Sequence, residues 1–218
     1  MSGKLIVFEG TDGSGKSTQF SLLCAALEQQ GREFRKLVFP QYQEPSSALI
    51  RMYLGGEFGN RPSDVNAYAA SSFYAVDRYA SYKKIWGEYY DKGGLILSDR
   101  YTTSNAVHQA SKVPEEEREN FLSWLEDFEY GKLGLPRPSI VFWLDMPIER
   151  AVANLRSREA ATHTSADIHE VDTAYLETCY TTAKRAAEFY GWKRIACVSE
   201  AGALRSPEEI HQEIMSLL

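Results

Sequence analysis

A glycine-rich segment near the amino end constrains this chain more than any other feature. The segment follows an apolar run at residues 5–8 and precedes apolar residues at helical spacing. It reads Gly10-Thr11-Asp12-Gly13-Ser14-Gly15-Lys16-Ser17-Thr18. The pattern G-x-x-x-x-G-K-[ST] between a strand and a helix is typical of a loop that binds phosphate. The alternative is a chance match in a glycine turn, and the flanking strand and helix argue against it.

The residue types in this loop suit a phosphate ligand. Gly10, Gly13 and Gly15 allow successive backbone N–H groups to point at an anion. The helix that follows adds unpaired N–H donors and the positive end of its dipole. We expect Lys16 to reach the β and γ phosphates of ATP, and the Ser17 hydroxyl to bind Mg²⁺. The sequence therefore predicts an ATP site at residues 10–18.

The composition restricts the classes of partner. The 218 residues carry a formal net charge of −6. An acidic balance of this kind argues against a general nucleic-acid or anionic-membrane binder. Cys24, Cys179 and Cys197 show neither C-x-x-C nor metal-ligand spacing, so we predict buried reduced thiols. No apolar run reaches membrane-spanning length and no signal peptide is recognisable, so the expected location is cytoplasmic.

Short apolar runs alternate with longer amphipathic segments along the chain. Strands are predicted at 5–8, 36–39, 95–97, 140–144 and 194–198. Helices are predicted at about 15–30, 46–54, 64–91, 103–110, 116–127, 147–158, 169–190 and 207–217. This alternation predicts an α/β fold, a parallel sheet with helices on both faces. In such folds ligands bind beyond the carboxyl ends of the strands.

One segment interrupts this alternation. Residues 159–167 are small and polar and show no periodicity, although they lie between two predicted helices. We expect a mobile loop or lid at about 156–168. The whole chain, residues 1–218, is then predicted to form one domain with this lid.

Two further segments have side chains suited to a second ligand. Phe39-Pro40 begins a proline-bracketed loop that contains Tyr42, and an ordinary connection is an equally good interpretation of that stretch. Tyr74 and Arg78 are four residues apart, so they share one face of a helix. A ring and a guanidinium there are able to stack on a base and bind a phosphate. Core packing of the ring beside a solvated arginine is the alternative.

A third segment joins a strand end to the start of a helix. Asp99 occupies the place of a second, metal-organising carboxylate in a phosphate-loop enzyme, and Arg100 adds an anion-binding group. A structural Asp–Arg pair is the other interpretation. Ser104, Asn105 and Gln109 supply hydroxyl and amide groups able to contact a base edge. A lone His108 in this setting is more often a packing or surface residue than a catalyst.

Taken together, these residues resemble the thymidylate kinase family. The similarity rests on the phosphate loop with Phe8-Glu9 before it, on Phe39-Pro40, and on Tyr-Ala-Val-Asp-Arg at 74–78. It also includes Asp-Arg-Tyr at 99–101 with Ser104-Asn105, and Gly-Leu-Pro-Arg-Pro at 134–138. The matching segments span essentially the whole chain, in the family's order.

The resemblance implies a fold, a reaction and a set of site residues. The family fold is a five-stranded parallel sheet of the P-loop nucleoside monophosphate kinase type, with a lid and usually a homodimer. The implied reaction is transfer of the γ-phosphoryl group of ATP to dTMP, with Mg²⁺. Lys16 and Ser17 match the ATP and metal positions, and Ser199–Ala203 matches the segment that holds adenine. The positions that match the acceptor site are Asp12, Tyr42, Arg78 and Arg100 near its sugar or phosphate, and Ser104 and Asn105 near the thymine edge.

Two departures from the family pattern leave roles open. The stacking position four residues before Arg78 holds Tyr74 instead of the more common phenylalanine, and Phe73 precedes it. Either ring is therefore a candidate for stacking on the base. The phosphate loop contains no arginine, so an arginine of the lid is expected to contact the transferring phosphoryl group, and Arg158 is favoured over Arg156. Two solvated arginines at a helix end are the alternative.

Other functions remain open on the sequence alone. The more similar alternative is another nucleoside monophosphate kinase or a deoxynucleoside kinase. Thymine differs from uracil by only one methyl group, and a pocket discriminates such a group by only roughly 1–3 kcal/mol. A nucleotide-binding regulator without turnover belongs to a different class. Lys16, Ser17, Asp99 and the paired arginines favour an enzyme over a regulator.

Overall fold

A five-stranded parallel sheet forms the centre of the computed structural model, which describes residues 2–162 and 173–218. The strands are β1 (Lys4–Glu9), β2 (Arg35–Val38), β3 (Leu95–Asp99), β4 (Ile140–Asp145) and β5 (Lys193–Ala196). Their order is β2-β3-β1-β4-β5, and every pairing is parallel. β1 is therefore the central strand, and its register places Phe8 opposite Asp99 of β3. The predicted five-stranded α/β fold is confirmed.

The main helices begin and end close to the predicted positions. They are α1 (Lys16–Gln29), α2 (Ala48–Leu54), α3 (Ala67–Ser81), α4 (Gly87–Asp91), α5 (Arg118–Glu126), α6 (Ile148–Thr162), α7 (Thr173–Tyr190) and α8 (Pro207–Ser216). A π-helical turn, η3 (Tyr82–Trp86), joins α3 to α4, so the predicted long helix is continuous. Two other π-helical turns, η4 (Asn105–Gln109) and η7 (Asp127–Lys132), lie beside the site described below. Sequence periodicity did not predict these π-helical turns.

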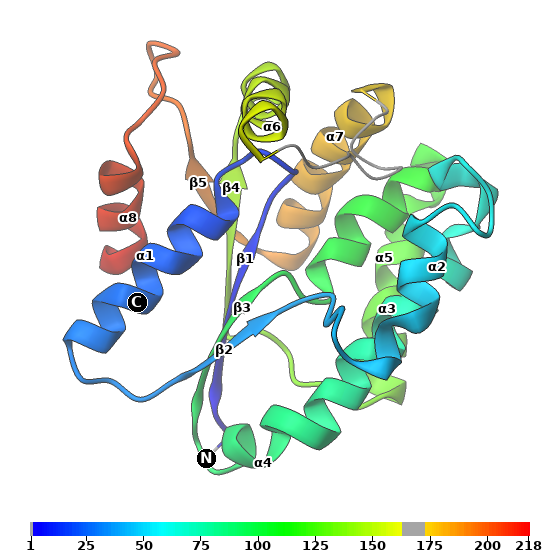
Figure 1. Ribbon diagram of the computed structural model, residues 1–218, viewed down its shortest axis with the longest axis horizontal. Coiled ribbons are helices and arrows are strands. Elements are labelled where there is room, and N and C mark those ends of the chain that lie inside the picture. Colours follow the sequence, from blue (N-terminus) through cyan, green and yellow to red (C-terminus); the bar gives the residue numbers. More distant parts are fainter. Residues whose placement is uncertain (1, 163–172) are drawn as a thin grey trace.

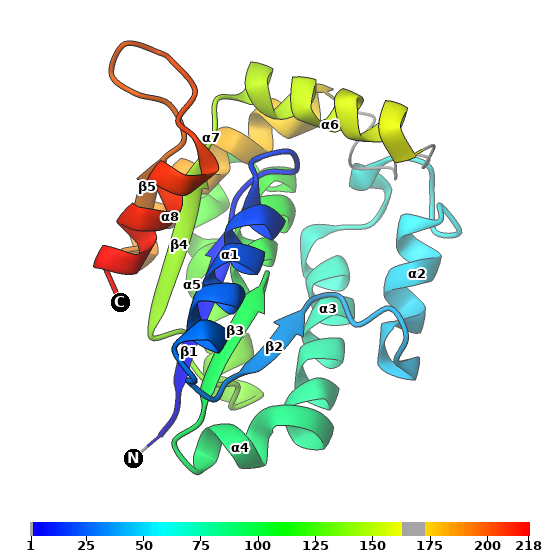
Figure 2. The same ribbon diagram turned by 60° about the vertical axis from the view of Figure 1, so that its left-hand side comes forward.

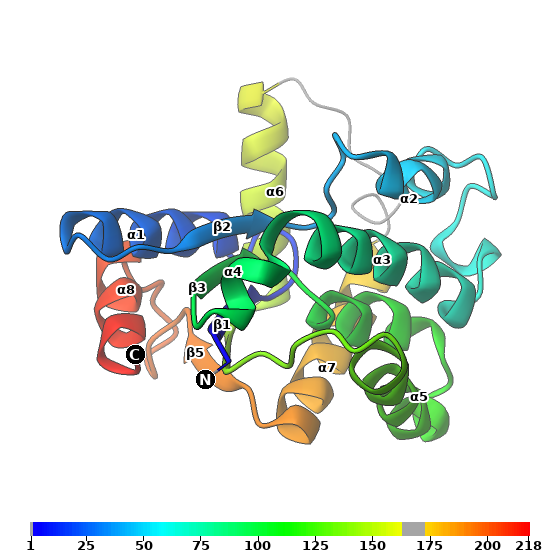
Figure 3. The ribbon, with the colours of Figure 1, turned by 90° about the horizontal axis from the view of Figure 1, so that it is seen from below.

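Apolar side chains alternate between the two faces of β1. Ile6 and Phe8 pack with Leu23 and Leu27 of α1 and Ile210 of α8, whereas Leu5 and Val7 belong to a separate cluster on the other face. Figure 1 and Figure 3 show α1 and α8 on one side of the sheet and α5 and α7 on the other. The alternation follows the two-residue period of a strand. The buried strands fix the positions of the loops at their carboxyl ends.

Helix α6 lies across the carboxyl ends of the central strands (Figure 2). It continues to Thr162, so residues 156–162 of the predicted lid are helical in the structure. The remainder of that prediction, residues 163–168, lies outside the described residues. Among the helices of the described ranges, none is long and apolar enough to span a membrane.

All three cysteines are free and buried, as predicted. Burial raises the pKa of the Cys179 and Cys197 thiols to about 12, so both stay protonated at neutral pH. Neither is therefore available as a thiolate nucleophile or metal ligand.

Candidate active site

The phosphate loop connects β1 to α1 and encloses the Lys16 ammonium group. Lys16 Nζ donates to the carbonyl oxygens of Gly10 (2.7 Å) and Thr11 (2.9 Å) and lies 3.7 Å from Asp12 Oδ1. Burial lowers the pKa of Lys16, and the nearby Arg100 cation lowers it further. Gly13 and Gly15 have φ angles of 79° and 89°, in the left-handed region that glycine adopts readily. The loop therefore presents a lysine and backbone donors at the start of a helix, as the sequence predicts.

A cavity of about 480 Å³ opens beside this loop. Six of the nine predicted ATP-site residues line it, whereas Gly10, Thr11 and Ser14 are buried and do not line it. The lining residues are Asp12, Gly13, Gly15, Lys16, Ser17, Thr18, Val38, Phe39, Asp99, Arg100 and Asn154. We refer to this space as the donor cavity.

Ser17 and Asp99 provide oxygen atoms suited to a hard cation. Ser17 Oγ donates to Asp99 Oδ2 at 3.1 Å, and Asp99 Oδ1 is buried without a hydrogen-bond partner among the described residues. Mg²⁺ in nucleotide sites commonly takes one or two protein oxygens and completes its shell with phosphates and water. No group of three or more His, Cys, Asp or Glu side chains in the described ranges is arranged to hold a metal. The residues present therefore fit a metal bound together with a nucleotide and do not form a metal site by themselves.

A second cavity, of about 230 Å³, lies between the strand ends and α3. All but one of the ten residues predicted for the acceptor line it. Its lining residues are Asp12, Phe39, Pro40, Tyr42, Leu54, Tyr74, Arg78, Arg100, Tyr101, Ser104, Asn105, His108 and Gln109. We refer to this space as the acceptor cavity.

The exception is Phe73, which faces elsewhere. Its ring packs against Tyr53 and Phe58, with centroid separations of 6.5 Å and 5.8 Å. Tyr74 lines the acceptor cavity. Of the two rings that the sequence left open for stacking, the structure places only Tyr74 in the cavity.

Arg100 and Asp12 form an ion pair where the two cavities meet. Arg100 also contacts Ser104 Oγ and His108 Nε2, both at 3.2 Å, and lies 3.7 Å from Glu9. Burial alone would lower the pKa of Arg100, but the carboxylates of Asp12 and Glu9 raise it above its ordinary value. A carboxylate is tolerated in this phosphate loop because it pairs with an arginine.

Glu9 links the phosphate loop to the segment after β3. It is fully buried, and its Oε2 accepts from the hydroxyls of Thr103 and Ser104, each at 2.7 Å, while its Oε1 accepts from the Gly10 N–H. Sequence reasoning gave Glu9 no role of its own. Its position as an acid at the end of an apolar run, directly before the glycine loop, is the sequence signal that could have indicated it.

Arg78 and Asn105 both contact a residue that the sequence did not single out. Glu129, in η7, is fully buried and accepts from Arg78 Nε at 2.7 Å and from Asn105 Nδ2 at 3.1 Å. It lies 51 residues from Arg78, and the acids that precede it, Glu126 and the exposed Asp127, gave no signal of its burial. Asn154 of α6 was also missed. Its Nδ2 donates to the Gly13 carbonyl at 2.8 Å.

Of the two lid arginines predicted from sequence, only Arg156 has a described side chain, and it does not line the donor cavity. Arg156 is exposed on α6. The Arg158 side chain lies outside the described residues. The turn Ser199–Ala203 forms a hairpin closed by a bridge between Val198 and Leu204, and its contact with adenine stays a prediction.

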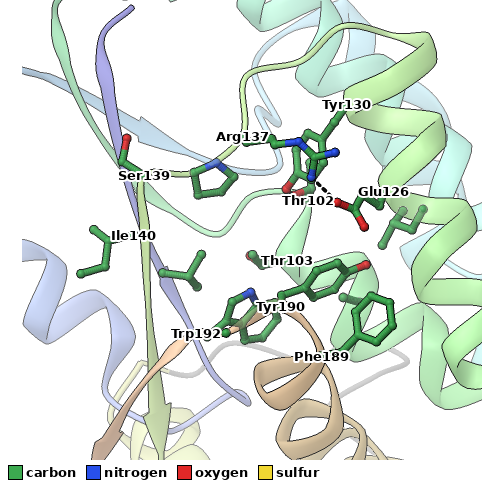
Figure 4. A pocket seen from close by; sticks show the side chains of 15 residues that line it. Thr102, Thr103, Glu126, Tyr130, Arg137, Ser139, Ile140, Phe189, Tyr190 and Trp192 are labelled. Carbon is green, nitrogen blue, oxygen red and sulfur yellow. Dashed lines mark hydrogen bonds and ion pairs between the residues drawn. The ribbon is translucent and has the colours of Figure 1, made fainter.

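A third cavity, of about 340 Å³, lies beside the amino ends of β4 and β5 (Figure 4). The rings of Tyr190 and Trp192 lie on one side of it, and Arg137 pairs with Glu126 on another. Thr102 and Thr103 line it, whereas the adjacent Ser104 lines the acceptor cavity. This space shares no lining residue with the donor cavity or the acceptor cavity.

Comparisons with known proteins agree with this geometry. The model of the family described as thymidylate kinase matches residues 8–214. The chain belongs to the thymidylate kinase family. As a member, it is a phosphotransferase enzyme.

Individual relatives and one solved structure support the same family. The chain is 34% identical to the thymidylate kinase of Mycobacterium tuberculosis strain H37Rv over 157 aligned residues, and this alignment covers 71% of each chain. It is 29% identical to a probable thymidylate kinase of Pyrococcus horikoshii, over 100% of this chain and 97% of the relative. A solved thymidylate kinase of Candida albicans aligns with a TM-score of 0.72 at 18% identity, covering 99% of this chain and 91% of the other. That structure supports the fold.

Proposed function

We propose that this enzyme transfers the γ-phosphoryl group of ATP to dTMP, giving dTDP and ADP. The observation that best supports this proposal is the boundary between the two cavities. Asp12, Phe39 and Arg100 line both of them, so a phosphoryl group is able to pass from one bound nucleotide to the other without leaving the protein. Kinases of this class act mainly by positioning and by electrostatic stabilisation.

On the donor side, each group has a role that follows from its position. Lys16 supplies a cation beside the β and γ phosphates, and backbone N–H groups of the loop supply neutral donors. Mg²⁺ would be held by Ser17 Oγ and Asp99, directly or through water, and would neutralise phosphate charge. Asn154 holds α6 against the loop through the Gly13 carbonyl and so covers the donor phosphates. This cover excludes water, which otherwise competes as an acceptor.

On the acceptor side, the two arginines differ in charge balance. Arg78 is paired with Glu129 in a buried ion pair, whereas Arg100 lies at the boundary with the donor cavity. Arg100 is better suited than Arg78 to bind a dianionic phosphate, because its partner Asp12 is about one-fifth exposed and able to separate from it. We therefore propose that Arg100 binds the dTMP phosphate and that Arg78, expected at the phosphate from sequence, contacts the base. Tyr74 supplies the stacking surface.

A coupled ADP-release assay tests the reaction. ATP with Mg²⁺ is supplied with dTMP, dUMP, dCMP, dGMP, AMP or thymidine, and we expect the highest kcat/KM with dTMP. A higher value for AMP or thymidine would favour another kinase of this fold. ATP binding without acceptor-dependent ADP release would instead favour the regulator.

The lid proposal rests on the absence of an arginine in the phosphate loop. We propose that an arginine of residues 156–168, with Arg158 favoured, contacts the transferring phosphoryl group. Arg158→Ala should then lower kcat at least roughly tenfold, about 1.4 kcal/mol, with a smaller change in dTMP affinity. Arg156→Ala serves as the paired variant. Normal kcat in both would reject a catalytic lid arginine.

We also propose a cytoplasmic homodimer. The outer side of α3 exposes Val76 and Tyr79, with 53% and 38% of their surface accessible, three residues apart on one face. Pairing two copies through this face would bury these side chains. Light scattering after chromatography should give twice the mass of one chain. The variant Val76→Glu should have the mass of a single chain.

A further inference from the structure

Glu129 is buried behind the wall of the acceptor cavity, with no exposed surface. Its two oxygens receive the Arg78 guanidinium side by side, at 2.7 Å from Nε to Oε2 and 2.5 Å from Nη2 to Oε1. Arg78 Nη1 donates to the Tyr101 carbonyl at 3.3 Å. Burial favours loss of charge on Arg78, but Glu129 raises its pKa above the ordinary value. Arg78 therefore keeps its charge, and the paired hydrogen bonds to Glu129 fix the guanidinium in one orientation.

The same carboxylate controls the orientation of the Asn105 amide. Asn105 Nδ2 lies 3.1 Å from Glu129 Oε1 and 3.2 Å from the Ser71 carbonyl oxygen. Both atoms are acceptors, so only the NH₂ end of the amide satisfies them. The oxygen end, Oδ1, is consequently left for the acceptor cavity that Asn105 lines. No described residue donates a hydrogen bond to it.

These two orientations give the cavity a defined hydrogen-bonding pattern. Asn105 presents an acceptor, and Arg78 has donor hydrogens on Nη1 and Nη2 beyond those used by Tyr101 and Glu129. A pyrimidine with a ring N–H beside a carbonyl complements an acceptor beside a donor. Cytosine presents the reverse pattern, a ring nitrogen that accepts beside an amine that donates. Both contacts would be mismatched with cytosine, and each buried mismatch carries a desolvation cost.

We propose that Glu129 is a positioning residue that makes the acceptor site select keto pyrimidines over aminopyrimidines, by holding the Asn105 amide with its oxygen toward the base. This inference rests on the proposed function, because it requires dTMP in the acceptor cavity. Glu129 touches no substrate and acts on base selection through the Asn105 amide. A carboxylate that served only as the partner of a buried arginine would affect stability and leave base selectivity unchanged.

The substrate pair that isolates this property is dTMP and 5-methyl-dCMP. They share the methyl group, the sugar and the phosphate, and differ only at the edge that Asn105 and Arg78 face. We expect the wild-type enzyme to prefer dTMP by roughly 10³-fold or more in kcat/KM, since a site built to hydrogen-bond one edge strongly rejects the mismatched one. Wild-type turnover of both at similar rates would overturn the inference while leaving the proposed reaction intact. Absence of turnover with dTMP would instead refute the proposed function.

Glu129→Gln tests the residue itself. The substitution replaces one acceptor oxygen by an NH₂ group and removes the bias on the Asn105 amide, so we expect the dTMP preference to fall at least tenfold. The matched control is Glu126→Gln, one helical turn away, where the acid pairs with Arg137 outside the acceptor cavity. It should keep the wild-type preference. An unchanged preference in folded Glu129→Gln would overturn the proposal.

A second variant distinguishes positioning from general damage. In an Asn105→Ala background the amide is gone, so adding Glu129→Gln should change the preference by less than threefold. A further tenfold loss there would show that Glu129 does not act through Asn105.

If Glu129→Gln fails to fold, Glu129→Asp keeps the charge and withdraws the carboxylate by one methylene. It should lower the preference in the same direction, and wild-type selectivity in that variant would overturn the proposal.

Discussion

Gly13 is the point at which helix α6 rests on the phosphate loop, and Gly13→Ala should disturb ATP use more than its small size suggests. An added Cβ would lie 2.1 Å from the Ala151 carbonyl oxygen of α6 and 3.1 Å from Leu155. The contact involves backbone, so α6 must withdraw by about 1 Å for the methyl group to fit, as in other overpacked interiors. That movement also breaks the hydrogen bond from Asn154 to the Gly13 carbonyl.

The magnitude has two parts, and a matched variant separates them. A left-handed φ costs a non-glycine residue about 1–2 kcal/mol. Overpacking adds about 1–3 kcal/mol, so Gly13→Ala should lose about 2–5 kcal/mol of unfolding free energy. Gly31 has a φ of 65° with open space around its Cβ position, so Gly31→Ala should lose only the first part.

Urea denaturation and steady-state kinetics in ATP, at saturating dTMP, provide the measurements. We expect kcat/KM for ATP to fall roughly 10²-fold in Gly13→Ala, because displacements of about 1 Å at a reacting centre have effects of that size. Gly31→Ala should retain wild-type kinetics. If the two variants lost equal stability and kept equal ATP kinetics, the proposed seating of α6 on the loop would be refuted.

Three further predictions use other parts of the site. Asp99→Asn should raise the Mg²⁺ concentration for half-maximal activity at least roughly tenfold, because the metal loses a charged ligand; an unchanged midpoint in a Mg²⁺ titration would contradict the metal assignment. Asn154→Ala should raise the KM for ATP several-fold through loss of a bond of about 0.5–1.5 kcal/mol, and leave the KM for dTMP unchanged in the same kinetic assay. Burial lowers the pKa of Lys112 to about 7 from an ordinary 10.5, so the unfolded chain binds the extra proton between these values and unfolding free energy should rise with pH across that window. In denaturation curves measured at pH 7 to 10, the unfolding free energy of Lys112→Met should lack that rise. The same dependence on pH in the variant and the wild type would contradict this prediction.

The fold was largely predictable because its three central strands, β3, β1 and β4, are buried. A strand covered on both faces, such as Leu95–Asp99, is a continuous apolar run ended by polar residues, and that signal is local. Boundaries were less accurate. The last strand ends at Ala196, earlier than the predicted Val198, since an apolar run can continue beyond the paired residues. The π-helical turns were not predicted, because a single turn of five or six residues is too short to show its own apolar period within a longer helical segment.

The site was predictable where function lies next to a motif in the sequence. Lys16, Ser17 and Asp99 belong to such motifs, and the structure places them together. Glu129 and Asn154 do not, since each acts across a tertiary contact with a residue far away in the chain. In the sequence, an acid or amide that makes a tertiary contact has the same local pattern as one that only faces solvent. Tyr74 and Phe73 could be told apart only when the direction of each ring was known.

The ion pair between Asp12 and Arg100 makes the affinities of the two substrates interdependent. A phosphate that draws Arg100 toward the acceptor leaves Asp12 with Lys16 as its nearest remaining cation, on the donor side. Bound dTMP therefore alters the charge that ATP meets. By thermodynamic linkage, ATP must then change the dissociation constant of dTMP by the same factor. One pair of side chains thus sets a coupling free energy between substrates that never share a binding pocket.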